Sequence, residues 1–119
     1  MFTYKCTIER IVDGDTYDIV LDLGFAIYVK ERVRLEGVDT PEIFGRNATP
    51  EGQVAKQFVE DWVAEKVDLP GYFVYRSIKY NAKDKYGRAL GSMEWIGDDG
   101  TTSVLSEELL NAGLAELYG

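Results

Sequence analysis

The chain has 119 residues, an apolar share of 45% and a formal net charge of −8, values typical of one folded domain and not of a disordered chain. The absence of histidine excludes Ser-His and Cys-His catalysis and histidine metal sites, and a single cysteine, Cys6, excludes an intrachain disulfide. No apolar run approaches the ~18 residues that cross a bilayer. The first residues lack the pattern of a signal peptide, so we expect no membrane association and a cytoplasmic protein, or a secreted one if a leader was removed.

The first third of the chain alternates apolar and polar residues as β-strands do. Strands are predicted over 3–12, 16–23 and 26–35. We attribute the turn at Asp13-Gly14 to the ease with which glycine takes positive φ, and we interpret Asp13 as a turn former. Cys6 lies in the first strand pattern and is expected to be a small core residue, not a nucleophile.

A long helix is predicted to begin at Thr49-Pro50, a hydroxyl N-cap followed by proline, and to run to about Lys66. Its wide apolar face is expected to include Val54, Phe58 and Trp62, flanked by Ala55, Val59 and Val63. The other predicted elements are strands over 72–79 and 88–96, a turn over 98–100, a second helix from 103 or 104 to 112, a C-terminal cap at Gly113 and an extended segment over 114–117.

Five short strands with a helix between the third and the fourth predict a strand-dominated α+β fold. The pattern matches the OB-fold, a five-stranded Greek-key β-barrel, here with two helices and one domain over residues 1–119.

Three short segments place charged side chains at turns: 12–16, 34–42 and 84–88. Carboxylates can hold a hard cation, and arginine can grip two phosphate oxygens at once. The combination is therefore typical of metal-assisted phosphodiester hydrolysis. Each residue also has a simpler interpretation when taken alone. Asp15 could form a turn, Asp39 could cap Thr40-Pro41, Arg88 could be an ordinary hairpin residue, and Arg32 looks as suitable as Arg34.

The three segments, in this order, resemble the staphylococcal nuclease family from about Tyr4 to about Leu117. The resemblance implies the OB-fold and a monomeric Ca²⁺-dependent nuclease. Such an enzyme cleaves DNA and RNA with little sequence preference, preferably where they are single-stranded or unstructured. Water would attack phosphorus and the 5′ oxygen would leave, which gives 3′-phosphate ends.

The resemblance also assigns roles to nine residues, and the spacing to Asp39 selects Arg34 over Arg32. Glu42 is either the general base that activates water or the residue that orients it. The implied roles are Ca²⁺ ligands for Asp15, Asp39 and the Thr40 carbonyl, catalysis for Arg34, Glu42 and Arg88, and substrate binding for Asp84, Lys85 and Tyr86.

The sequence departs from the family pattern in two places. The family's third, C-terminal helix is absent, and the loop over 43–48 is short with only Arg46 as a basic residue. Together with the acidic balance, which lacks the usual basic footprint, this predicts weak capture of long polyanions. The alternatives are a catalytically weak or inactive OB-fold module that binds nucleic acid or protein, and a generic acidic OB-domain. The module would be expected to lack carboxylates or arginines of the motifs, and none is missing.

Overall fold

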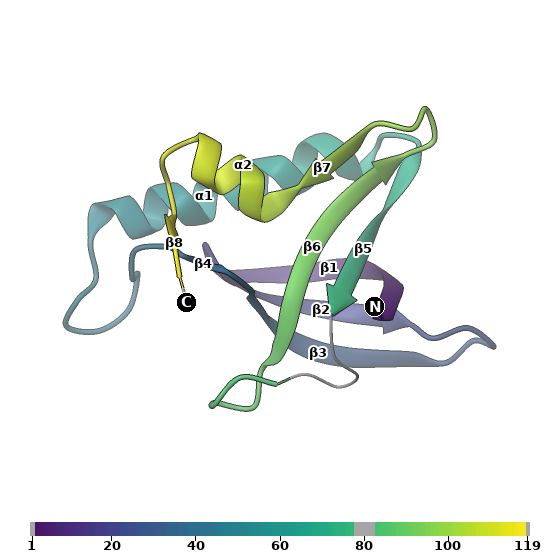
Figure 1. The fold of residues 1–119 in the computed structure, drawn as a ribbon, viewed down its shortest axis with the longest axis horizontal. Coiled ribbons are helices and arrows are strands. Elements are labelled where there is room, and N and C mark those ends of the chain that lie inside the picture. Colours follow the sequence, from purple (N-terminus) through teal and green to yellow (C-terminus); the bar gives the residue numbers. More distant parts are fainter. Residues whose placement is uncertain (1, 78–82, 119) are drawn as a thin grey trace.

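The computed structural model describes residues 2–77 and 83–118, and its centre is a closed five-stranded barrel with two helices on one side (Figure 1). The strands of the main sheet follow the order β3-β2-β1-β5-β6-β7, and a parallel pairing of β3 with β6 closes the barrel. The strand-dominated OB-fold predicted from the sequence is confirmed. The sheet contains β1 (Phe2–Asp13), β2 (Thr16–Asp22), β3 (Tyr28–Leu35), β5 (Gly71–Ser77), β6 (Ala89–Gly97) and β7 (Thr102–Val104).

The β2–β3 hairpin shows how the alternation builds both faces of the barrel. Tyr17 and Ile19 are fully buried, whereas Asp18 between them lies on the outer face and pairs with Arg32 of β3. Strand β3 begins two residues later than predicted, because Phe25 and Ala26 adopt left-handed backbone conformations with φ of 55° and 60° in the loop. The predicted first and second strands agree with β1 and β2 to within one residue.

Helix α1 (Pro50–Val67) begins where the sequence predicts, but its details differ in two ways. Thr49 is the extended N-cap residue, yet its hydroxyl makes no capping hydrogen bond. The buried face runs along Gly52, Ala55, Val59 and Trp62, so the prediction for Val54, which is 53% exposed, is wrong. Small residues in the first turns let the helix pack closely on the loop at Glu42. A Cβ at position 52 would overlap the Glu42 carbonyl.

The second half of the chain completes the core. The Trp62 indole donates a hydrogen bond of 2.9 Å to the Ser103 hydroxyl, and its ring lies 5.4 Å from that of Phe73. Helix α2 (Leu105–Asn111) follows β7, and Gly113 takes the predicted positive φ after it. Strand β7 was not predicted because it is only three residues long. Residues 78 and 79 of the predicted strand over 72–79 lie outside the described residues.

A second, small sheet lies beside the barrel. Strand β4 (Val38–Asp39) pairs antiparallel with β8 (Glu116–Leu117), part of the predicted terminal extended segment (Figure 1). The segment before β8 packs on the core through Leu114 and Ala115.

Cys6 also packs against the core, and burial raises the pKa of its thiol to about 12, as expected for a core residue and not for a nucleophile. No helix of the described ranges is long and apolar enough to span a membrane.

Candidate active site

The turn between β1 and β2 places Asp15 against the loop that follows β4. The Asp15 amide donates to the Asp13 carboxylate at 3.0 Å, which confirms Asp13 as a turn former. Gly14 does not take positive φ, so that part of the prediction is wrong. Glycine is needed at position 14 because other segments approach it closely: a Cβ there would lie 2.7 Å from the Thr40 hydroxyl and 2.9 Å from the Ala55 Cβ. Glycine thus lets α1, the turn and the Thr40 loop meet.

Asp15 is a buried carboxylate with several partners. Its Oδ2 accepts the Thr40 amide at 3.0 Å and lies 3.5 Å from Arg34 Nη2, while its Oδ1 accepts the Thr16 hydroxyl at 3.3 Å. Burial raises the pKa of Asp15, but its bonds with Asp13 and Thr40 and the charge of Arg34 outweigh burial and hold that pKa below the usual value. Burial, followed by the neighbouring Asp15, raises the pKa of Asp13 to about 7. Asp15 is therefore the member of this pair that keeps its negative charge.

Arg34 joins the two predicted ligand carboxylates. Its Nη2 donates to Asp39 at 3.0 Å, while its Nη1 donates to the carbonyls of Leu35 and Val38. The Arg34 side chain is only 11% exposed. Arg32 instead pairs with Asp18 at 2.7 Å on the outer face, so the spacing to Asp39 selected the arginine that lies beside the carboxylates.

The donor set around Arg34 fits a hard cation. One nitrogen of the Arg34 guanidinium lies 3.5 Å from the Asp15 carboxylate and 3.0 Å from the Asp39 carboxylate, so both carboxylates face the same positively charged group. Partial burial and then the charge of Asp15 raise the pKa of Asp39, although Arg34 opposes this. A cation would relieve that repulsion. Among the described residues no three Asp, Glu, Cys or His side chains gather as a metal cluster, so the Thr40 carbonyl and water would have to complete the coordination.

Arg88 is positioned by its own turn. Asp84 accepts the Arg88 amide at 2.9 Å through Oδ1 and the Arg88 Nε at 2.6 Å through Oδ2. Arg88 Nη1 donates to the Thr16 hydroxyl at 3.3 Å, which connects this turn to Asp15. Both carboxylate oxygens of Asp84 therefore accept hydrogen bonds from within its own turn, chiefly from Arg88. The ring of Tyr86 is 71% exposed, with the Lys85 and Arg88 cations 5.2 and 5.3 Å from its centre.

Glu42 stands apart from this cluster. Its carbonyl accepts the Thr49 amide at 3.0 Å, and its backbone contacts Gly52 of α1. Its side chain is exposed, and no hydrogen bond or ion pair joins it to another described residue. The structure therefore places this carboxylate on a loop held against α1, free to meet a substrate or water.

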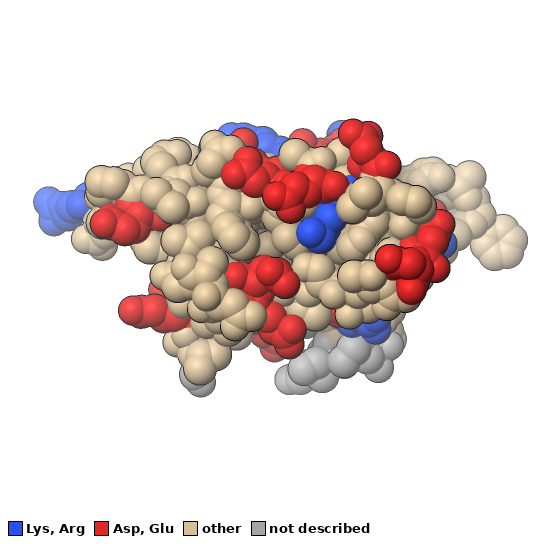
Figure 2. Space-filling view, turned by 90° about the horizontal axis from the view of Figure 1, so that it is seen from above, with Lys and Arg blue, Asp and Glu red and all other residues tan. Residues whose placement is uncertain are grey.

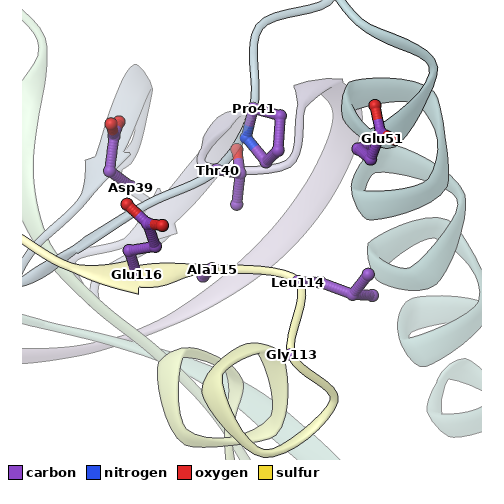
Figure 3. A pocket seen from close by; sticks show the side chains of 8 residues that line it. All are labelled: Asp39, Thr40, Pro41, Glu51, Gly113, Leu114, Ala115 and Glu116. Carbon is purple, nitrogen blue, oxygen red and sulfur yellow. The ribbon is translucent and has the colours of Figure 1, made fainter.

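A hollow of about 280 Å³ opens next to Asp39 (Figure 3). Glu51 of α1 and Glu116 of β8 line it together with Asp39, and the Asp39 and Glu116 side chains extend on the same side of the small sheet. Sequence reasoning missed both glutamates, because neither stands in a motif and the fold alone brings them here. Thr16 lies within the 12–16 segment, but the sequence indicated no role of its own for it. Acidic side chains also dominate the face that carries the helices (Figure 2).

Comparison with known proteins points in one direction. The family model described as staphylococcal nuclease homologue matches residues 32–119. The chain is 37% identical over 110 residues to a thermonuclease of Staphylococcus intermedius, with 91% of this chain and 56% of that protein covered. It is 30% identical over 117 residues to the endonuclease YhcR of Bacillus subtilis, and 29% identical over 133 residues to an uncharacterized protein of Methanocaldococcus jannaschii. These two matches cover 97% of this chain but 9% and 59% of the relatives, so the chain spans only part of the length of all three.

Proposed function

The chain belongs to the staphylococcal nuclease homologue family, and from this premise we propose that it is a Ca²⁺-dependent nuclease. It would hydrolyse phosphodiester bonds of DNA and RNA with little sequence preference, favouring single-stranded or unstructured substrate and acting as a monomer. The observation that carries the proposal is one continuous chain of polar contacts, from Asp39 through Arg34 and Asp15 to Thr16 and Arg88. It gathers two carboxylates and two arginines from three separate turns.

The carboxylates and the Thr40 carbonyl would hold the cation. Among the described residues no backbone amide donates to that carbonyl, which leaves it available as a ligand. When bound, Ca²⁺ supplies positive charge that stabilises the charge developing on the phosphate and lowers the pKa of nearby water. The chain's own contribution is to hold Asp15 through the Thr40 amide and the Thr16 hydroxyl, so that its carboxylate does not need to reorganise.

The arginines would stabilise the phosphate as it accumulates negative charge on its nonbridging oxygens. Two carbonyls hold one edge of Arg34, and Asp84 holds the Nε of Arg88. Each guanidinium is therefore fixed before substrate arrives, and fixed donors cost little to reorganise in the transition state.

Three exposed residues would act on the attacking water and on a terminal phosphate. Glu42 would accept a proton from the attacking water or orient that water, and the 5′ oxygen would leave to give a 3′-phosphate end. Lys85 and Tyr86 would contact a terminal phosphate, since the ammonium and the hydroxyl both suit phosphate oxygens. Their exposure on the 84–88 turn, next to Arg88, supports this assignment.

The test is a cleavage assay on labelled single-stranded DNA and RNA, with Ca²⁺, with Mg²⁺ and with chelator. We expect cleavage that needs Ca²⁺ and falls on the order of 10²-fold in Arg88→Lys, which keeps the charge but loses the two-pronged geometry. Substrate binding without cleavage under all conditions would overturn the enzyme and favour the binding module. Cleavage that survives in chelator would overturn the cation dependence.

A further inference from the structure

We infer that Thr16 is a positioning residue whose hydroxyl holds Arg88 and Asp15 in fixed relation, an inference that rests on the proposed nuclease function for its catalytic consequence. The hydroxyl donates to Asp15 Oδ1 at 3.3 Å and accepts from Arg88 Nη1 at 3.3 Å. Thr16 is only 2% exposed, so water does not easily replace either contact.

The position of Thr16 in the barrel explains this geometry. It is the first residue of β2, opposite Asp13 of β1 and opposite Arg34 of β3. The next residue, Tyr17, enters the core, so the Thr16 side chain lies on the other face of the strand, with both arginines. Strand β2 thus places the Thr16 hydroxyl between the Asp15 carboxylate and the Arg88 guanidinium.

The chemistry of a hydroxyl suits this junction. One hydroxyl donates one hydrogen bond and accepts up to two, so it can serve a carboxylate and a guanidinium at the same time. Valine has nearly the same shape but offers neither function. Serine keeps both functions without the methyl group.

Thr16 is the residue of the β1–β2 turn that holds the Arg88 guanidinium in position. Asp84 fixes only the Nε edge of the guanidinium, and it belongs to the same turn, 84–88, as Arg88 itself. Among the described residues, the bond to Thr16 is the sole side-chain hydrogen bond between that turn and residues 13–16. Without this hydrogen bond, the Nη nitrogens of Arg88 would no longer be held at a fixed position relative to Asp15. A guanidinium that binds the phosphate in the wrong position lowers turnover.

The kinetic experiment compares Thr16→Val, Thr16→Ser and the matched control Thr7→Val, a threonine of β1 exposed outside the site. We expect Thr16→Val to lower kcat by about tenfold to a hundredfold with a smaller change in KM, Thr16→Ser to retain most activity, and Thr7→Val to match wild type. In the Arg88→Lys background, Thr16→Val should lower kcat by a smaller factor than it does in wild type, because the part of its effect that acts through Arg88 is already lost. Independent, multiplying losses would overturn the inference, as would a Thr16→Ser variant as impaired as Thr16→Val.

A second readout does not depend on activity. The Nη–H resonances of Arg88, assigned by their loss in Arg88→Lys, should shift and exchange faster with water in Thr16→Val and stay near their wild-type positions in Thr16→Ser. Urea unfolding of each variant identifies any that fails to fold. If wild type cleaves nothing, the proposed function fails while this spectrum still decides the positioning role. An Arg88 resonance that Thr16→Val leaves unchanged would refute that role.

Discussion

Replacing Arg34 with lysine tests whether one guanidinium both supports the fold and completes the site. Arg34 Nη1 donates hydrogen bonds to two carbonyls, and Nη2 donates to Asp39 and lies near Asp15. The Arg34 side chain is 11% exposed. A lysine ammonium is a single point and cannot reach both sets of acceptors. Because a hydrogen bond that involves a charged group contributes about 1.5–3 kcal/mol, we expect Arg34→Lys to lower the free energy of unfolding by roughly 2–3 kcal/mol.

The same change should lower turnover on the order of 10²-fold, as for other fixed donors that face a developing charge. Urea unfolding gives the stability, and cleavage of labelled DNA, measured where each variant is fully folded, gives the turnover.

Arg32→Lys is the matched control for this experiment. It lies two residues away on the same strand face, but its side chain is 49% exposed and pairs, among the described residues, with Asp18 alone. Exposed pairs contribute about 0.2–1 kcal/mol, so stability and turnover should change little. If Arg32→Lys and Arg34→Lys were equally damaging in either measurement, the reasoning from burial and partner number would be refuted.

Three further predictions concern charge. Because partial burial and Asp15 raise the pKa of Asp39, its ionised form is disfavoured on folding, and stability from the neutral form is lost as pH rises through the folded pKa. Asp39→Asn should therefore melt at an equal or higher temperature in chelator and lose the increase that Ca²⁺ gives wild type; equal Ca²⁺ shifts in both would exclude Asp39 as a ligand. Burial raises the pKa of Asp84, but hydrogen bonds from the amides of Arg88 and Tyr86 and from the Arg88 side chain outweigh burial and lower it. The stabilisation by ionised Asp84 should therefore be present above its usual pKa and be lost as pH falls through the pKa of the folded state. Asp84→Asn should lack this acid-dependent loss in pH-resolved melts, and an unchanged pH profile would count against the Asp84–Arg88 pair. Finally, binding of DNA to Glu42→Gln should be weak in chelator and stronger with Ca²⁺, with a salt slope of about two to four phosphate contacts; tight Ca²⁺-independent binding with a steep slope would reveal a basic face.

The parts of the site that the sequence predicts are those fixed by short distances along the chain. Arg34 and Asp39 are five residues apart, at the end of one strand and in the next short one, so the turn between them determines their contact. Asp84 and Arg88 are related in the same way, four positions apart in one turn. Strand alternation likewise indicates which side of β3 carries Arg34.

The parts that the sequence does not predict depend on packing between distant segments. Gly14 looks like an ordinary turn glycine until α1 and the Thr40 loop are placed against it. Val54 of α1 is exposed, and Gly52 is buried in its place, because the first turn of the helix packs so closely on Glu42 that only a residue without a Cβ fits there. Glu116 reaches the site only because β8 pairs with β4, and two-residue strands leave no periodic signal.

The arrangement of charge gives a physical reason for the proposed cation dependence. Arg34 lies between Asp15 and Asp39, and Arg88 is paired with Asp84, so each arginine's charge is already balanced by carboxylates of the chain. Glu51 and Glu116 add negative charge at the adjoining hollow, on a chain of formal net charge −8. A phosphodiester that approached these groups alone would meet a net negative potential. A divalent cation held by these carboxylates would reverse the sign of the local potential. The acidic surface is therefore compatible with a nuclease whose affinity for its substrate is created at the site by the cation and not by a basic face.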